Sequence, residues 1–206
     1  MNNRSSEWKR DTSETSVVVK LVLDGTGKAE VETGIGFLDH LFASLARHAR
    51  FDLALTCRGD LHVDDHHTAE DCGIALGAAI DAALADRSGI SRFGHAYAPL
   101  DEALARAVVD ISGRPFARID LGLARESLGV LSCENIPHVL QSLATSAHLT
   151  LHVDVLGGEN DHHRAEAAFK SVALALRQAV SMSGFTDVPS TKGVLGALGE
   201  DLEESP

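Results

Sequence analysis

Histidine and glutamate recur in this chain in a pattern that suits metal binding. Eleven of the 206 residues are histidine, and they include the runs HHTAE (66–70) and HHRAE (162–166). On a helix, the first histidine and the glutamate of each run are four residues apart and lie on the same face. Both side chains can therefore hold one ion. The second histidine points about 100° away, so we expect it to contact a different ion.

Two further histidines belong to an internal repeat. The segments HLFASLA (40–46) and HVLQSLA (138–144) share the pattern H-x-x-x-S-L-A, 98 residues apart, and the two HHxAE runs follow them at an offset of 96. His and Glu are poor core residues, so packing alone does not explain their presence in both copies. The ligand set predicted from the repeat is His40, His66, His67, Glu70, His138, His162, His163 and Glu166.

Eight ligands suggest two ions with four protein ligands each. We expect one site to hold His40, His66, Glu70 and His163, and the other to hold His138, His162, Glu166 and His67. Three imidazoles and one carboxylate leave open positions on an octahedral ion, which a catalytic metal needs. Mn²⁺ fits this description best, with Fe²⁺ or Co²⁺ as alternatives and Zn²⁺ able to compete.

Carboxylates next to these ligands are candidates for orienting the imidazole N–H groups. Metal-bound histidine usually donates its other ring N–H to such a group. The carboxylates expected to act in this way are Asp64, Asp65, Asp71 and Asp161.

The elements that carry these residues follow one order in both copies. A helix with a lone histidine is followed by an alternating strand (51–57 and 149–155), and HHxAE then opens a second helix. Upstream, two strands flank a turn at 24–27 and at 112–115. We therefore predict an α+β fold. It is an internally duplicated unit of mainly antiparallel sheet backed by helices, and its two halves are related by pseudo-twofold symmetry.

We expect one domain over 1–206, with repeat halves of about 11–90 and 91–190. Residues 122–134 are extra in the second half. The polar end 1–10 and the acidic tail 196–206 are expected to be mobile.

Composition narrows the class of partner and the location. The net charge of −12 argues against nucleic acid or an anionic membrane as partner. No apolar run is long enough to span a membrane, and the first sixteen residues are polar and charged, so we expect no secretory signal there. Three cysteines without close pairing favour a reducing compartment, so we expect a cytoplasmic protein.

Several motifs resemble the imidazoleglycerol-phosphate dehydratase family over residues 10 to about 196. They are RDTSET (10–15), TGIGFLDHL (33–41), GDLHVDDHHTAED (59–71), SRFG (91–94), DISGRP (110–115), NDHHRAEAAFK (160–170) and STKG (190–193). The length fits the monofunctional form. The segment around His138 lacks the aromatic pair that often follows this histidine in the family.

The resemblance implies a hydro-lyase of histidine biosynthesis. Its reaction dehydrates D-erythro-imidazoleglycerol phosphate to imidazole acetol phosphate through a dimetal-bound imidazolate. It also implies two Mn²⁺ ions per active site, and a homo-oligomer of twenty-four copies built from trimers, with sites between subunits.

The resemblance further implies roles for individual residues. The pattern R-x-T-x-E-T makes Glu14 the general acid and base, and we count both HHxAE motifs among the catalytic groups. The substrate phosphate needs cations and donors, and Lys170 shares the face of Glu166 because it lies four residues later. The predicted substrate-binding residues are Arg92, Arg114, Lys170, Ser190 and Lys192.

Two other functions remain as alternatives. Another dinuclear metal-dependent enzyme, such as a phosphohydrolase, would usually bridge its ions with carboxylates, whereas this set is rich in imidazole. A non-catalytic metal-binding protein would have no use for the predicted phosphate-binding cations.

Overall fold

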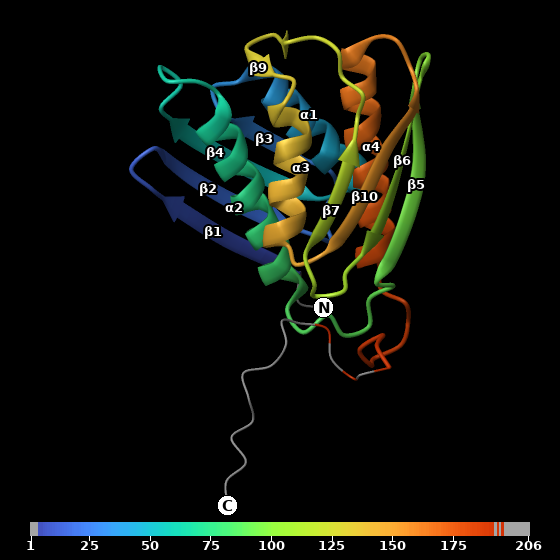
Figure 1. Cartoon of the computed structure of the whole chain (residues 1–206). Helices are drawn as coiled ribbons and strands as arrows, with labels where there is room; N and C mark the ends of the chain where they lie inside the picture. Colours follow the sequence, from blue (N-terminus) through green and yellow to red (C-terminus); the bar gives the residue numbers. More distant parts are fainter. Residues whose placement is uncertain (1–3, 192, 194, 196–206) are drawn as a thin grey trace, which may run out of the picture.

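The first half of the chain folds into a four-stranded sheet and two helices (Figure 1). The computed structural model describes residues 4–191, 193 and 195. The elements of this half are β1 (Ser5–Asp11), β2 (Thr15–Val22), β3 (Ala29–Glu32), α1 (Gly36–Ala49), β4 (Asp52–Gly59) and α2 (His66–Leu84).

The second half repeats this order and adds a short hairpin. The predicted α+β duplication is therefore confirmed, and the hairpin β8–β9 lies within the extra segment 122–134. The elements of this half are β5 (Phe93–Leu100), β6 (Ala103–Asp110), β7 (Phe116–Asp120), β8 (Ser127–Leu128), β9 (Leu131–Ser132), α3 (Asn135–Ser146), β10 (Thr150–Gly157) and α4 (Asp161–Val180).

The strands that flank each predicted turn are not neighbours in the sheet. The orders are β1-β2-β4-β3 and β5-β6-β10-β7, so β4 and β10 lie between them. Each sheet has two antiparallel pairs and one parallel pair, β3 with β4 and β7 with β10. Parallel neighbours need a crossover, which α1 supplies in the first half and α3 in the second. The crossover helix, rather than the turn, decides which strands pair.

The expectation of a mobile end over 1–10 is wrong for the residues described there. Strand β1 pairs with β2 along its whole length, from Ser5 opposite Val22 to Asp11 opposite Ser16. The Ser6 hydroxyl donates to the Ala79 carbonyl of α2 at 2.6 Å. An edge strand gains its order from backbone hydrogen bonds, so the polar side chains of this segment did not indicate that it is ordered. The acidic tail 196–206 lies outside the described residues.

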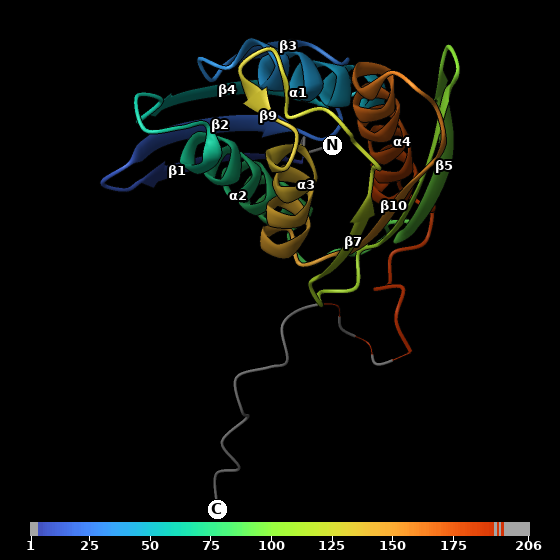
Figure 2. The same ribbon diagram turned by 45° about the horizontal axis from the view of Figure 1, so that its top comes forward.

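The helices lie between the two sheets (Figures 1 and 2). Helices α1 and α2 cover the first sheet, whereas α3 and α4 cover the second. Between these layers, α1 packs against α4 and α2 packs against α3. Each helix of one half therefore has its helical partner in the other half.

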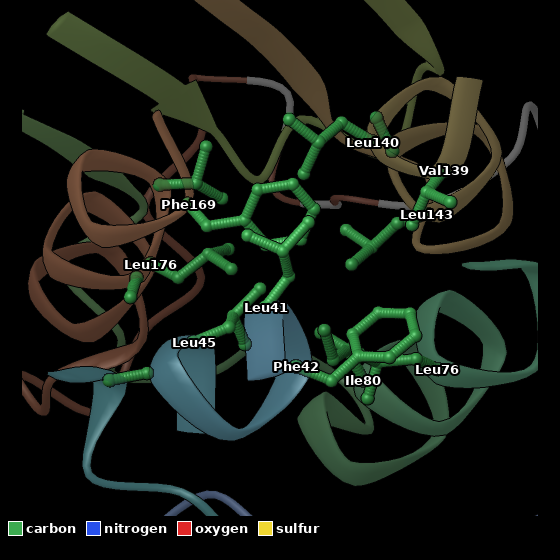
Figure 3. Packing of buried hydrophobic residues seen from close by; sticks show 14 of the residues in the cluster. Leu41, Phe42, Leu45, Leu76, Ile80, Val139, Leu140, Leu143, Phe169 and Leu176 are labelled. Carbon is green, nitrogen blue, oxygen red and sulfur yellow. The ribbon is translucent and has the colours of Figure 1, made fainter. Parts of the chain in front are cut away.

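Apolar side chains from all four helices meet in one core (Figure 3). Phe42 of α1 meets Phe169 of α4 edge to face, with ring centroids 6.4 Å apart. Within the described part of the chain, no helix has the length and apolar character needed to cross a membrane.

Two glycines of α2 allow α3 to approach closely. A Cβ atom at Gly73 would lie 2.7 Å from the Val139 carbonyl oxygen, and one at Gly77 would overlap the Leu143 carbonyl. The start of α3 is thereby held against the start of α2, where the first HHxAE run lies.

Candidate metal centre

Three predicted ligands meet where α2 and α3 pack together. We call His66, Glu70 and His138 the α2–α3 cluster, since their ligand atoms all lie within 4.8 Å of one another. His138 Nε2 is 3.1 Å from Glu70 Oε1, and the His66 and His138 rings stack with centroids 5.0 Å apart. A pocket of about 300 Å³ opens beside these two rings.

The repeat counterparts of these three residues meet where α1 and α4 pack together. We call His40, His162 and Glu166 the α1–α4 cluster. Glu166 Oε2 is 3.0 Å from His40 Nε2 and 3.3 Å from His162 Nε2. Partial burial raises the pKa of Glu166, but hydrogen bonds from His40 and Lys170 outweigh it and lower the pKa to about 2. The carboxylate is therefore ionised and ready to bind a cation.

The predicted division of the ligands between two sites is wrong for the lone histidines. His40 joins the HHxAE motif of the second half, and His138 joins that of the first half. The reason is the packing of the helices, because α1 lies against α4 and α3 against α2. The predicted pairing of the first histidine with the glutamate four residues later is present in both clusters.

The second histidine of each motif turns away from its cluster. The rings of His66 and His67 are inclined at 75°, and those of His162 and His163 at 89°. His67 Nδ1 lies 3.0 Å from Asp60, a hydrogen bond that raises the pKa of His67. Glu14 is near the other side of this ring, with 3.7 Å between Glu14 Oε1 and His67 Nε2.

His163 has a matching carboxylate partner. Its Nδ1 lies 2.7 Å from Glu102 Oε2. Hydrogen bonds from the Asn160 backbone and from His163 lower the pKa of Glu102 to about 2. Glu102 lies just before β6, as Glu14 lies just before β2. Sequence analysis missed Glu102 because it is 61 residues from His163 along the chain. Asp60 is only seven residues before His67, but an irregular turn joins the two, so no regular spacing pointed to their contact.

The four carboxylates expected to orient imidazole rings have other partners. Among the described residues 4–191, none of these four carboxylates forms a hydrogen bond with a histidine ring nitrogen. Each accepts hydrogen bonds from a backbone N–H, a hydroxyl or an arginine. The donors are His66 N for Asp64, Ser132 for Asp65, Arg10 and Thr15 for Asp71, and Ala124 N and Arg125 N for Asp161. Asp64, Asp65 and Asp161 lie at helix starts, whereas Asp71 lies within α2 and ties this helix to Arg10 of β1 and Thr15 of β2.

The predicted phosphate-binding residues fall into two groups. Lys170 Nζ lies 2.9 Å from Glu166 Oε1, next to the α1–α4 cluster. Arg92 instead lies at the far end of α4, where its N–H donates to the Ala179 carbonyl and its guanidinium to the Pro189 carbonyl. Thirteen residues of helix separate Glu166 from Ala179, a rise of about 20 Å.

Arg114 and Ser190 share the end of the molecule where Arg92 lies. The Thr150 hydroxyl, at the start of β10, donates to the Arg114 carbonyl at 3.4 Å. Ser190 directly follows Pro189, which Arg92 contacts. Lys192 lies outside the described residues. A single chain thus presents its candidate metal ligands at one end and these phosphate-binding candidates at the other.

The donor chemistry of both clusters fits a divalent ion. Imidazole nitrogen and carboxylate oxygen without thiolate suit Mn²⁺, Fe²⁺, Co²⁺ or Zn²⁺. The side chains of His40 and His162 are 47% and 44% exposed, so additional ligands can reach an ion held there. Each cluster offers three protein ligands, which leaves coordination positions open for other ligands on an octahedral ion.

Fold and site together define a duplicated α+β protein with two imidazole–carboxylate clusters, each built from both halves. A family model described as imidazoleglycerol-phosphate dehydratase matches residues 33–176. The chain belongs to this family.

Individual relatives carry the same description. The imidazoleglycerol-phosphate dehydratase of Scheffersomyces stipitis is 53% identical, over 93% of this chain and 99% of the relative. That of Phytophthora nicotianae is 60% identical over 93% of this chain, which spans only 42% of that relative's length. The crystal structure of IGPD from Pyrococcus furiosus is 36% identical, with a TM-score of 0.78 over 91% of this chain and 99% of that one.

Proposed function

We infer that this protein is imidazoleglycerol-phosphate dehydratase, a hydro-lyase of histidine biosynthesis. The observation that carries the inference is the pair of clusters, His66–Glu70–His138 and His40–His162–Glu166, in a chain of this family. The reaction expected from the family resemblance converts D-erythro-imidazoleglycerol phosphate into imidazole acetol phosphate.

Two divalent ions per active site, Mn²⁺ first among them, are part of this proposal. When bound, the ions supply Lewis acidity to the imidazole ring of the substrate, which has no carbonyl group to acidify its C–H bonds. The chain's own clusters hold these ions, and we propose His67 and His163 as further ligands from neighbouring subunits. Their rings point away from the clusters of their own chain.

We propose Glu14 as the general acid and base. It lies near His67 but belongs to neither cluster, so it can hold or release a proton without leaving an ion. Its side chain is 48% exposed, which leaves it accessible to a substrate.

The positions of the proposed phosphate-binding side chains support an active site shared between subunits. The imidazole and phosphate of the substrate are joined by only three carbon atoms, with bonds of about 1.5 Å. Such a molecule cannot extend from Glu166 to Arg92 of the same chain, about 20 Å apart along α4. We propose that Arg92, Arg114, Ser190 and Lys192 of one subunit bind the phosphate beside the metal ions of another, where Lys170 also lies.

The assembly and location follow the same reasoning. Sites shared between subunits require an oligomer, and the family resemblance suggests twenty-four copies built from trimers. A cytoplasmic location is supported by Cys57, Cys72 and Cys133, all of which are buried and unpaired.

Product analysis tests this function against its alternatives. Purified protein loaded with Mn²⁺ should convert imidazoleglycerol phosphate to imidazole acetol phosphate without releasing inorganic phosphate. Phosphate release would favour a phosphohydrolase. Absence of any turnover from protein that binds two ions per chain would favour a non-catalytic metal-binding protein.

A further inference from the structure

Asn135 is a buried polar residue beside the α2–α3 cluster. It opens α3, is only 3% exposed and lines the pocket next to His66 and His138. Its Oδ1 lies 2.9 Å from His66 Nδ1. This contact with a candidate metal ligand indicates the role of Asn135.

The surroundings of Asn135 define which atom of its amide faces His66. The amide also hydrogen-bonds the Asp65 carboxylate, which accepts from the Ser132 N–H at 2.6 Å and from its hydroxyl at 2.8 Å. A carboxylate only accepts, so the NH₂ group of Asn135 must point to Asp65. The Oδ1 atom then accepts from His66 Nδ1–H, which leaves the lone pair of Nε2 for an ion.

The α1–α4 cluster is supported differently. The repeat places Phe37 where the other half has Asn135, since each lies three residues before the lone histidine. The Phe37 ring packs on His162 with centroids 4.9 Å apart, inclined at 53°. A phenyl ring offers His162 no oxygen or nitrogen acceptor, so it does not select a tautomer in the way that Asn135 does.

A second difference concerns the glutamates. Glu166 is paired with Lys170 four residues later, at 2.9 Å, and an ion at this cluster must share the carboxylate with that ammonium group. The repeat places Ile74 where the second half has Lys170, so Glu70 has no cation four residues later. Both differences favour cation binding at the α2–α3 cluster.

We propose that Asn135 is a positioning residue that makes the α2–α3 cluster the tighter of two unequal metal sites, so that this cluster fills first. The proposal rests on the two-ion site of the proposed function. Polar groups that orient a metal-bound imidazole typically contribute 10–100-fold to metal affinity, which sets the expected difference between the sites at about that factor. The extra hairpin β8–β9 contributes through Ser132, because it holds Asp65 and thereby the amide of Asn135.

Equilibrium titration of the metal-free, full-length assembly with Mn²⁺ tests the proposal. We expect two classes of site, separated by about tenfold or more in Kd. His66→Ala should abolish the tighter class and His162→Ala the weaker one, which assigns each class to its cluster. Two classes of equal affinity would overturn the proposal and leave the two-metal function intact. Absence of Mn²⁺ binding would overturn both.

Variants of Asn135 then separate positioning from folding. Asn135→Leu removes the acceptor and should weaken the tighter class by about 10–100-fold, with the weaker class unchanged. Asn135→Asp keeps an acceptor for His66 Nδ1–H but loses the donor to Asp65, so it should weaken that class less than Asn135→Leu does. Phe37→Leu is the matched control in the other half and should leave the tighter class unchanged. Equal weakening of both classes by Asn135→Leu would show a merely structural role and overturn the proposal.

A variant on the other cluster does not depend on the tolerance of Asn135 to change. Lys170→Gln removes the ammonium group from Glu166 and should strengthen the weaker class, bringing the two Kd values closer together. An unchanged or weaker class would contradict the proposed source of the difference.

Discussion

The second histidine of each HHxAE motif lies beside a glutamate that directly precedes a strand. Glu14 lies near His67 and precedes β2, and Glu102 contacts His163 and precedes β6. The duplication has thus placed a carboxylate at the same point of each half. Their surroundings differ, since Glu102 also accepts hydrogen bonds from the Glu159 and Asn160 backbones. Glu102 is therefore held in place, whereas Glu14, the proposed general acid and base, is the more exposed of the two.

Replacement of Glu14 should separate proton transfer from metal binding. Glu14→Gln keeps the shape of the side chain and removes its proton affinity, so kcat should fall by about 10²–10⁴-fold. Both ions should remain bound, since Glu14 belongs to neither cluster. Steady-state kinetics and metal analysis of the same preparation check this. Glu7→Gln, on the exposed edge strand β1, is the control and should keep full kcat. Loss of an ion from Glu14→Gln would assign this residue to the ligands.

Asp52 gives a pH-dependent contribution to stability. Its Oδ1 accepts from the N–H groups of Thr26, Gly27 and Lys28 at 2.7–3.0 Å. Hydrogen bonds from the Lys28 and Thr26 backbones hold the pKa of Asp52 below its ordinary value of 3.8. A lowered pKa in the folded state means that the stabilisation is present above about pH 4. It is lost as the pH falls through the folded-state pKa.

Asp52→Asn should lower the Tm by roughly 2–4 °C at neutral pH, since Asp52 is half-exposed and its hydrogen bonds are partly screened. The difference from the wild type should shrink as the pH falls below about 4, because both proteins then carry a neutral side chain at this position. Thermal unfolding across pH 2–7 at one protein concentration measures it. Asp120→Asn, at the exposed end of β7, is the control. A difference that stays constant down to pH 2 would contradict the assigned cause.

At the scale of elements, the clusters depend on which helices pack together. His138 reaches Glu70 because the α2 backbone at Gly73 and Gly77 lies directly against α3 carbonyl groups. Ordinary helix propensity favours alanine over glycine by about 1 kcal/mol, so these glycines weaken α2 in isolation. Their presence is explained by the close contact, which brings the starts of α2 and α3 together.

Gly77→Ala should therefore destabilise the protein in spite of the gain in helix propensity. The added Cβ would overlap the Leu143 carbonyl, a backbone atom that cannot move away on its own. We expect a net loss of about 1–3 kcal/mol, as for other overpacked positions, and weaker metal binding at the α2–α3 cluster. Gly36→Ala, where nothing lies within 4 Å of the added Cβ, is the matched control.

Chemical denaturation and Mn²⁺ titration of both glycine variants measure these effects. Gly36→Ala should be neutral or slightly stabilising. If Gly77→Ala were as stable as Gly36→Ala, close packing of α2 and α3 would not explain the glycine.

At the scale of the whole molecule, candidate metal ligands and most phosphate-binding candidates lie at opposite ends. Arg92 and Arg114 lie beside the end of α4 and the start of β10, whereas Glu166 lies near the start of α4. A closed homo-oligomer can bring the two ends of different copies together by symmetry. In the proposed shared site, the two ends of the duplicated fold would therefore face different neighbouring subunits.

Mixed assemblies of two inactive variants test this arrangement. Arg114→Met removes a proposed phosphate contact, and Glu166→Gln removes a proposed carboxylate ligand of the metal. In a one-to-one mixture, about a quarter of the sites combine an intact metal end with an intact phosphate end, so about that share of wild-type activity should return. Co-purified assemblies with separate tags, assayed against each parent, measure it. Activity no greater than the mean of the two parents would indicate a site within one chain.

Sequence alone determined the features set by local geometry. The spacing of His66 and Glu70, and of His162 and Glu166, places each pair on one helical face, because 3.6 residues complete a turn. The offset of about 97 residues between like segments disclosed the duplication before any fold was known. The motifs also identified the family, because they preserve the residue types that metal chemistry requires.

Only the tertiary structure decided which distant residues meet. His40 lies beside His162 and Glu166 of the second HHxAE motif because α1 packs on α4. His138 lies beside His66 and Glu70 of the first because α3 packs on α2. That choice depends on core packing between segments about 100 residues apart, which no local spacing encodes. Long-range packing also decided that β1 is ordered and which carboxylates contact His67 and His163. It likewise placed the buried amide of Asn135 against His66.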